Sequence, residues 1–420
     1  MSSASSALRP TRKFLGLEWP REVTLAERRS LIAGGLGWML DAFDVMLYSM
    51  VLAHLMRDLG MSKETGGLLN SITLIASAVG GLLFGFIADR IGRTRSLMAS
   101  ILVYSLASGA CGLSDSVVQF AICRLILGLG MGGEWTAGAA LIAETWPAEH
   151  RGKALGIMQS TWAIGEMAAA AAAGLILPRY GWRPVFFVGI LPAFVIFWIL
   201  RRVPESEVWQ KQNRQRLELR RFMRREILRP GLIATAMNAC GMFGYWGLFT
   251  WIPAYLSLPV AQGGRGLSMM TTTAWLLVMG VGKWFGYALF GFAADAIGRR
   301  KSYVFYLLVA AALVPLYGLA KTSLWLFILG PPVAFFGTGF FSGYGALAAE
   351  IFPTEIRASA MGLSYNFGRG FSAFAPFVVG ALAMRFGLGL AFFLQAAAFF
   401  VAALLALALP ETKGVSLDAV

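Results

Sequence analysis

The sequence predicts an all-α integral membrane protein with twelve transmembrane helices arranged as two six-helix halves. Of its 420 residues, 57% are hydrophobic and only 14% are charged, whereas soluble domains carry about 25% charged residues. Apolar runs of about 20 residues, enough for a helix to cross a bilayer core, recur along the whole chain, and its two halves resemble each other. This composition excludes an ordinary soluble enzyme, a disordered chain and a secreted disulfide scaffold.

Twelve apolar runs qualify as spans, and one charged stretch divides them into six and six. The spans are expected at roughly 31–55, 66–88, 97–115, 118–143, 153–177, 183–203, 231–258, 271–294, 302–320, 324–349, 359–383 and 388–409. The expected segments are a leader (1–30), a first half (31–203), a linker (204–230), a second half (231–409) and a tail (410–420). The basic linker is expected either as a solvated connector or as an amphipathic helix lying on anionic lipid.

The net charge of +14 follows the predicted topology. Lys and Arg are concentrated in the leader, in the linker and in the loops on the same side of the predicted bundle, so the positive-inside rule places both termini in the cytoplasm. No small-residue cleavage site follows the first apolar run, which predicts an uncleaved leader. We therefore expect a multi-pass protein of the plasma (bacterial inner) membrane. Because the basic residues do not form a soluble face with interleaved aromatics, nucleic acid is not an expected partner.

An internal repeat relates the two halves. One constant offset carries Gly85, Asp89, Gly92 and Arg93 onto Gly291, Asp295, Gly298 and Arg299. The same offset carries Glu144, Pro147, Glu149 and Arg151 onto Glu350, Pro353, Glu355 and Arg357, and Pro204–Glu205 onto Pro410–Glu411. Two like-oriented halves of this kind form a pair about the membrane normal, enclose a site near the midplane and give alternating access by rocking.

The repeated residues also carry a family resemblance. The segment from Gly85 to Arg93, repeated from Gly291 to Arg299, resembles the loop signature of the major facilitator superfamily. The Glu/Arg pairs at the ends of the spans, together with 204–206 and 410–414, resemble its sugar-porter-like branches. The resemblance covers nearly the whole chain and implies the major facilitator fold. Ala296 stands where the first repeat has Arg90, so the second loop is expected to be the weaker latch.

These motif residues are candidates for gating. Carboxylates and guanidiniums at the cytoplasmic ends of spans form charge-assisted networks, and a network that forms in one state and breaks in the other biases the equilibrium between the two. The alternative is that the same bonds staple loops to helices without switching. The candidates are Asp89, Arg90, Arg93, Glu144, Arg151 and Glu205 in the first half and Asp295, Arg299, Glu350, Arg357 and Glu411 in the second.

Acidic side chains inside the first half are candidates for proton coupling. An ionisable residue in a span costs at least about 2.5–3.5 kcal/mol, which marks it as a functional hypothesis. Asp41, Asp44 and Tyr48 are spaced three and four apart and share one helical face. Two carboxyls one turn apart cannot both ionise cheaply, so at least one is expected to hold a proton. Glu134 and Glu166 compete for the same role, and a structural pair is the alternative.

Basic and amide side chains are candidates for substrate binding. Arg369 lies deep in a span without an acidic neighbour and needs an anion, which a substrate carboxylate would supply in bidentate geometry. Asn366 shares its face, and Tyr365 lies one turn away. The alternative partner is a carboxylate of the other half. Arg124 is either a substrate ligand or a fixed partner of Asp41, Asp44 or Glu134. The remaining substrate-binding candidates are Tyr48, Gln159, Asn238, Tyr245 and Lys283.

The motifs of three spans resemble those of the carboxylate–proton symporters of the superfamily, with the sialate/lactate branch first and the aromatic-acid branch second. They are Asp41–Asp44, Gly132–Trp135 and Tyr365–Arg369. The resemblance implies a monomeric transporter that carries a small organic anion with protons across the lipid bilayer, without another cofactor. The alternatives are a proton-coupled sugar or polyol porter and, more remotely, a non-transporting receptor. An enzyme is not expected, because no nucleophile–base set or metal-ligand cluster occurs in the spans, and no nucleotide-binding loop indicates a pump.

Overall fold

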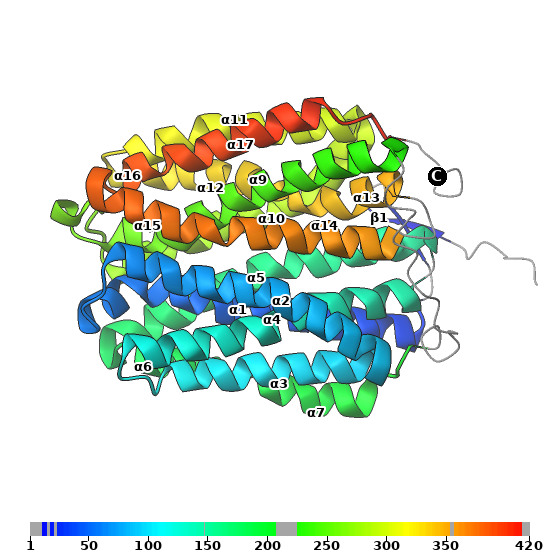
Figure 1. Ribbon diagram of the computed structural model, residues 1–420, viewed down its shortest axis with the longest axis horizontal. Coiled ribbons are helices and arrows are strands. Elements are labelled where there is room, and N and C mark those ends of the chain that lie inside the picture. Colours follow the sequence, from blue (N-terminus) through cyan, green and yellow to red (C-terminus); the bar gives the residue numbers. More distant parts are fainter. Residues whose placement is uncertain are drawn as a thin grey trace, which may run out of the picture.

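The computed structural model describes residues 11–14, 17–20, 23–146, 148–206, 225–352 and 357–413, and within these ranges some side chains are not described, among them those of Asp89, Arg151, Asp295 and Arg357. Long helices run side by side along one direction (Figure 1). The first half contains α1 (Leu25–Asp58), α2 (Lys63–Ile91), α3 (Arg93–Cys111), α4 (Val117–Thr145), α5 (Ala148–Tyr180), α6 (Arg183–Val188) and α7 (Pro192–Arg202). The second contains α9 (Arg225–Ser257), η2 (Val260–Gln262), α10 (Met269–Ile297), α11 (Arg299–Leu319), α12 (Ser323–Gly339), α13 (Phe341–Ile351), α14 (Arg357–Ser372), α15 (Phe374–Phe386), α16 (Leu388–Ala391) and α17 (Phe393–Leu407).

The twelve predicted spans correspond to these helices, four of them as interrupted rods: α6 with α7, α12 with α13, α14 with α15, and α16 with α17. Among the described residues, ten helices are long and apolar enough to cross a membrane, and Arg183–Ile199 is a shorter apolar segment. The remaining span is α3, which begins with Arg93 and carries several serines on buried positions. Its polar face packs inside the half. The serines lower the mean hydropathy of α3, although it lies in the bundle as a span.

The leader contains an element that the all-helical prediction lacks. Strands β1 (Thr11–Phe14) and β2 (Leu17–Pro20) form a two-stranded antiparallel sheet in which Thr11 pairs with Pro20. The hairpin lies at the end of the bundle where the chain also finishes (Figure 1). Four-residue strands are too short to give a periodic signal in the sequence.

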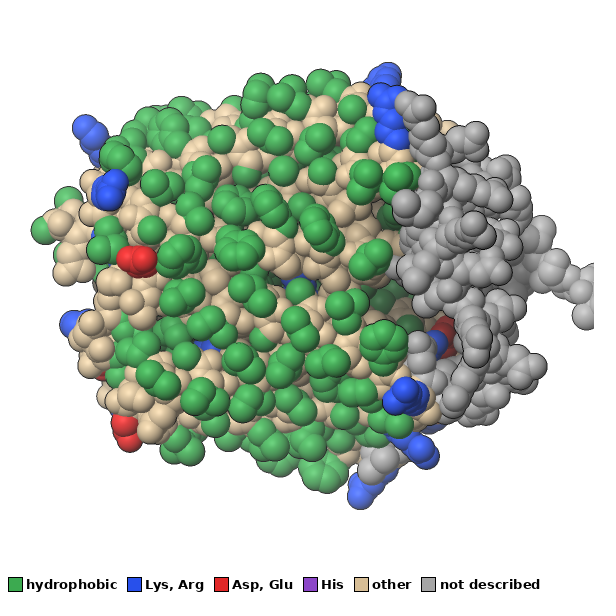
Figure 2. All heavy atoms as spheres, in the orientation of Figure 1, with side chains coloured by type: hydrophobic (Ala, Val, Ile, Leu, Met, Phe, Trp, Pro, Cys, Tyr) green, Lys and Arg blue, Asp and Glu red, His purple; other side chains and the backbone are tan. Residues whose placement is uncertain are grey.

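Polar residues mark where the helices begin. Thr24 caps α1 with a capping box, and Ser62, Ser116, Ser268 and Thr322 cap α2, α4, α10 and α12 by accepting a backbone N–H. Such caps satisfy N–H groups that a helix start leaves free. Between them, large apolar side chains cover the outer surface, while Lys and Arg gather near the two ends (Figure 2). This surface fits a lipid-facing girdle.

The repeat is visible in the backbone. Gly92 and Gly298 occupy equivalent turns, with φ of 108° and 104°. A side chain at these positions would also collide, because an added Cβ would lie 2.2 Å from Oε2 of Glu205 and 2.5 Å from Oε2 of Glu411, respectively. Only glycine therefore fits both turns.

The two ends of the bundle differ. We call the end where α1 begins and α17 finishes the motif end, on the right in Figure 1, and the opposite one the far end. At the far end the halves touch backbone to backbone: a Cβ on Gly67 would lie 2.2 Å from the Pro376 carbonyl oxygen, and one on Gly380 2.4 Å from that of Lys63. Lys63 Nζ also donates to the Gln262 carbonyl at 2.6 Å. The far end is closed in this state.

Candidate functional site

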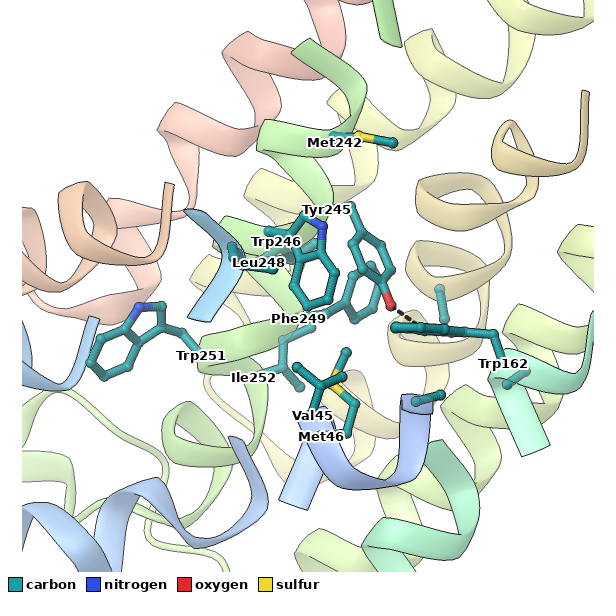
Figure 3. Close-up of a cluster of buried hydrophobic side chains, with 14 of the residues drawn as sticks. Val45, Met46, Trp162, Met242, Tyr245, Trp246, Leu248, Phe249, Trp251 and Ile252 are labelled. Atoms are coloured by element: carbon teal, nitrogen blue, oxygen red, sulfur yellow. Dashed lines mark hydrogen bonds between the residues drawn. The ribbon is translucent and has the colours of Figure 1, made fainter. Parts of the chain in front are cut away.

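A small cavity lies between the two halves, near the middle of the bundle. Seven of its ten lining side chains are aromatic, and Arg369 is the charged one among them. Figure 3 shows Trp162 reaching from the first half toward Tyr245 and Trp246 on α9. The lining residues are Trp38, Gln159 and Trp162 from the first half and Met242, Tyr245, Trp246, Tyr287, Phe341, Tyr365 and Arg369 from the second.

Arg369 is held at a break in the helix. Pro376 has no N–H and its ring crowds the carbonyl four residues back, so α14 ends at Ser372 and α15 begins at Phe374. The Arg369 carbonyl accepts the Ser372 hydroxyl at 2.8 Å. The side chain is 2% exposed, and no carboxylate of another described residue lies within ion-pair distance of its guanidinium. The cavity therefore contains a buried cation without an ionic partner among the described side chains.

The neighbours of Arg369 divide between the cavity and the helix interface. Tyr365 lines the cavity and stacks on Trp135 of α4, with ring centroids 4.4 Å apart and planes 8° apart. Asn366 faces α2 instead: its Nδ2 donates to the Gly362 carbonyl at 3.0 Å, and a Cβ on Gly81 would lie 2.7 Å from its Oδ1. The helical spacing that places Asn366 beside Arg369 thus does not bring it to the cavity wall in this state.

Glu166 and Lys283 form a buried ion pair across the two halves, behind the cavity wall. Tyr245 donates to Glu166 Oε1 at 2.5 Å, and Trp162 Nε1 donates to the same oxygen at 2.9 Å and to the Tyr245 hydroxyl at 2.8 Å. Lys283 Nζ also lies 3.7 Å from the centroid of the Phe249 ring. The structure therefore balances the charge of Lys283 within the protein.

Asp41 and Glu134 are buried carboxyls that form no hydrogen bond with the part of the chain that the structure describes. They are 1% and 0% exposed, and none of their four oxygens has a hydrogen-bond partner among the described residues. Glu134 packs closely against α1, where a Cβ on Gly37 would lie 2.3 Å from its Oε1. Asp41 lies within range of the charges of both Glu134 and Arg369. The three form one group, which we call the open charge group.

Asp44 lies one turn further along α1 toward the far end, and Arg124 lies nearer than Glu134 to that end of α4. Asp44 Oδ1 accepts the Ser108 hydroxyl at 2.8 Å, while Oδ2 has no partner among the described residues. Arg124 donates to Asn70 Oδ1 at 2.9 Å, and its guanidinium lies 4.5 Å from the centroid of the Tyr48 ring. Its charge acts on Asp44. Tyr48 itself donates to the Gly66 carbonyl at 2.5 Å, so it serves helix packing here.

The remaining substrate-binding candidates divide between the cavity wall and the helix interfaces. Gln159 and Tyr245 line the cavity, whereas Asn238 lies against α14 and directs Nδ2 toward the Met242 sulfur at 3.8 Å. The aromatic walls, of which Trp38 and Trp246 are examples, were not predicted from the sequence. Neither was Asn70, whose Nδ2 donates to Thr250 Oγ1 at 2.9 Å and joins the halves. The many Trp residues in the predicted spans were the sequence signal that could have indicated the aromatic walls.

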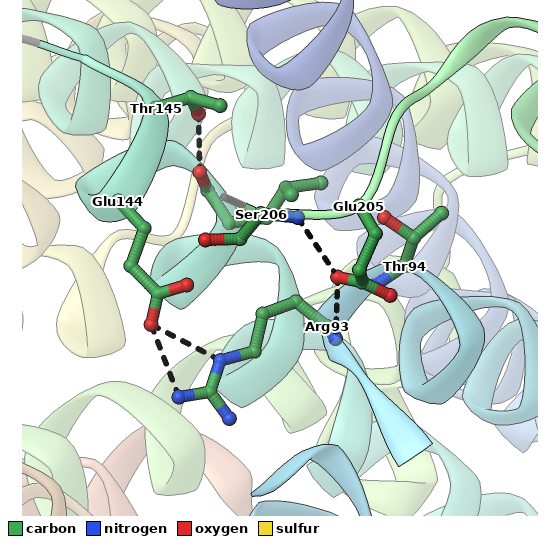
Figure 4. Close-up of polar contacts among 7 residues, drawn as sticks. Arg93, Thr94, Glu144, Thr145, Glu205 and Ser206 are labelled. Carbon is green, nitrogen blue, oxygen red and sulfur yellow. Dashed lines mark hydrogen bonds and ion pairs between the residues drawn. The ribbon is translucent and has the colours of Figure 1, made fainter. Parts of the chain in front are cut away.

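The motif residues of the first half form bonds inside that half (Figure 4). Arg93 pairs with Glu144 at 3.0 Å, and Glu205 accepts the backbone N–H of Arg93 at 2.8 Å and that of Thr94 at 3.1 Å. A carboxylate in this position caps the start of α3. Arg90 is exposed.

The second half repeats the pattern. Arg299 pairs with Glu350 at 3.2 Å, and Glu411 accepts the Arg299 N–H at 2.7 Å. Lys413 Nζ donates to the Ala296 carbonyl at 2.9 Å, next to the position that Arg90 occupies in the first repeat. These bonds staple helices within one half. The side chains of Asp89, Arg151, Asp295 and Arg357 lie outside the described residues, so gating by these motifs stays a prediction.

Comparison with known proteins places the chain in a family. The model of the Major Facilitator Superfamily matches residues 35–281 and 256–418. The cis,cis-muconate transport protein of Acinetobacter baylyi is 33% identical over 87% of this chain and 90% of the relative, and the sialic acid transporter of Escherichia coli is 29% identical over 91% and 93%. The crystal structure of a D-xylose-proton symporter matches with a TM-score of 0.76 at 22% identity, over 93% of this chain and 99% of that one. The two halves, the repeated motif turns and these matches show that the chain belongs to the Major Facilitator Superfamily of membrane transporters.

Proposed function

We propose that this transporter carries a small organic carboxylate together with a proton, by alternating access. The observation that carries the proposal is Arg369: a buried guanidinium in the central cavity with no carboxylate partner among the described residues. A guanidinium binds a carboxylate through two parallel hydrogen bonds. Muconate and sialic acid, which the names of two relatives give as their substrates, are carboxylic acids.

Among lactate-, sialate- and aromatic-acid-like substrates, the cavity favours the last. Its walls are mainly indole and phenol rings, which stack on planar ligands and bury their faces. A polyhydroxylated acid needs many hydrogen-bonding partners, whereas Gln159 is the one amide side chain among the residues that line the cavity. A flat acid with its carboxylate at Arg369 matches both the charge of the cavity and the aromatic character of its walls.

The open charge group supplies a route to coupling. Asp41 and Glu134 cannot both ionise cheaply at close range in a low dielectric, and Arg369 is the cation that compensates a negative charge there. When a substrate carboxylate binds Arg369, this compensation is shared with the ligand, and proton uptake by Asp41 or Glu134 becomes favourable. Substrate and proton therefore load together, with Asp41 as the first candidate and Glu134 as the second.

The motif end corresponds to the cytoplasmic side in the orientation that the distribution of Lys and Arg predicts. With the far end closed, exchange with the cavity in this state proceeds toward the motif end. We accordingly propose a monomer of the bacterial inner membrane with both termini in the cytoplasm.

Uptake into proteoliposomes tests the proposal. Labelled benzoate, lactate, sialate and a hexose are offered with and without an inward proton gradient. We expect gradient-driven accumulation of benzoate, with inhibition by other flat monocarboxylates and none by hexose. Competition by hexose would favour a sugar or polyol porter, and ligand binding without flux would indicate a receptor. Accumulation that does not respond to the proton gradient would refute symport.

A further inference from the structure

We propose that Glu166 and Lys283 form a charge latch between the two halves, which holds the far end closed and has to break before that end opens. The inference rests on alternating access as proposed above, and it does not depend on which substrate is carried. Glu166 belongs to α5 in the first half, and Lys283 belongs to α10 in the second. Their ion pair is buried, with the two side chains 7% and 6% exposed.

In the latch, the carboxylate of Glu166 accepts hydrogen bonds from residues of both halves. Glu166 accepts from Trp162 of its own half and from Tyr245 and Lys283 of the other. Charge-assisted bonds of this kind are among the stronger ones that a protein forms. Lys283 gains further stabilisation from the rings of Phe249 and Tyr245, whose centroids lie 3.7 Å and 5.1 Å from Nζ.

The latch lies between the two helices that must separate when the far end opens. From Glu166 onward, α5 and α10 stay in contact toward that end: a Cβ on Gly280 would lie 2.2 Å from Met167 Cγ, and one on Gly174 2.4 Å from Thr273 Oγ1. The latch is the charged link at the inner limit of this contact, beside Trp162 and Tyr245 of the cavity wall. Rocking that opens the far end must separate α5 from α10, and so it must separate Glu166 from Lys283.

The latch differs in kind from the motif bonds. Arg93–Glu144 and Arg299–Glu350 each join helices of one half, so rigid-body rocking leaves them intact. A bond that crosses the halves contributes to the difference in free energy between the two states, and such a difference is what shifts populations.

Distances between spin labels measure the effect. Labels are placed at Tyr180, 69% exposed at the end of α5, and at Met270, 64% exposed at the start of α10, after replacement of the three native cysteines. We expect Glu166→Gln and Lys283→Met to increase the ratio of far-end-open to far-end-closed molecules by about tenfold or more, since charged hydrogen bonds contribute about 1.5–3 kcal/mol. The exchanged variant Glu166→Lys/Lys283→Glu should move the ratio back toward the original.

A matched control removes an ion pair within one half. Asp115 and Arg183 pair at 3.2 Å near the far end of the first half, so Asp115→Asn should leave the distances unchanged. If a single variant does not fold, the doubly neutral Glu166→Gln/Lys283→Gln, which leaves no lone buried charge, takes its place. Unchanged distance distributions in the folded latch variants would overturn the proposal. Because these distances are measured without substrate, failure of the latch is distinguishable from failure of the carboxylate assignment.

Discussion

Two buried charged groups flank the cavity, and they are satisfied to different degrees. Behind one wall, Glu166 meets Lys283, Tyr245 and Trp162, so its carboxylate is fully engaged. In the open charge group, the oxygens of Asp41 and Glu134 have no hydrogen-bond partner among the described residues, and Arg369 faces the cavity. The difference indicates that a satisfied ion pair is suited to holding helices together, whereas the unsatisfied groups are the ones that we propose take up a proton and a ligand.

The energetic contrast supports this division. Buried polar groups without partners are costly, and a protein retains them where function requires them. A buried ion pair with additional hydrogen bonds repays much of its desolvation cost. We therefore expect the free energy of the open charge group to change strongly when a proton or an anion binds. The free energy of the Glu166–Lys283 pair should change mainly when the helices move apart.

Removal of Arg369 is expected to have the largest effect on the open charge group. Arg369→Ala should lower carboxylate uptake by at least about 30-fold, since loss of one partner of a buried charge pair costs about 2–5 kcal/mol. Arg369→Lys should keep transport but raise the KM, because an ammonium lacks the planar fork. Uptake kinetics in proteoliposomes provide the measurement.

The matched control is Arg183→Ala, which removes an exposed arginine at the far end and should leave uptake unchanged. If Arg369→Ala transports carboxylate normally, Arg369 does not bind the substrate carboxylate, and Arg124 becomes the next residue to test.

Asp41→Asn tests whether the open charge group carries the coupling proton, because the amide keeps the size and shape of the carboxyl but cannot be ionised. An amide cannot carry a coupling proton, so we expect loss of gradient-driven accumulation while exchange of labelled for unlabelled substrate continues. Both activities are measured in the same vesicles. Normal accumulation by Asp41→Asn together with its loss in Glu134→Gln would transfer the proton to Glu134. Normal accumulation in both would exclude the open charge group from coupling.

Much of the fold followed from the sequence, since hydrophobic length and the repeat locate the spans. Arg369 was identifiable because a lone arginine in an apolar run needs an anion. The pairing of Glu166 with Lys283 was not, because it depends on which helices of the two halves meet. Asn366 shows a related limit: helical spacing gives a common face, but packing against α2 decides where its amide points. The aromatic walls of the cavity could not be predicted, because Trp and Phe are common in membrane helices and their presence alone does not mark a cavity.

Asp44 lies between the two extremes, since Ser108 satisfies one of its oxygens and not the other. We expect Asp44→Asn to reduce gradient-driven accumulation less than Asp41→Asn does, because an amide oxygen still accepts the Ser108 hydroxyl. The ratio of internal to external substrate at a fixed proton gradient is the readout, with Ser108→Ala as the companion variant. A complete loss of accumulation in Asp44→Asn alone would place the coupling proton at Asp44, where the charge of Arg124 acts.

The smallest expected effect concerns Trp135, which stacks on Tyr365 of the cavity wall. Trp135 lies about ten residues from the motif end of α4 and Tyr365 about eight from that end of α14, so at about 1.5 Å per residue the pair lies at the motif-side wall of the cavity, which Tyr365 lines. Their stack joins the two halves by rings alone, whereas the far end is closed by backbone contacts. An aromatic pair contributes about 0.5–1.5 kcal/mol, so Trp135→Ala should accelerate release toward the motif side by about two- to tenfold. Trp135→Phe, which keeps a ring, should change it less. Efflux from loaded vesicles of defined orientation measures the rate, and an unchanged rate in Trp135→Ala would show that this stack does not limit release.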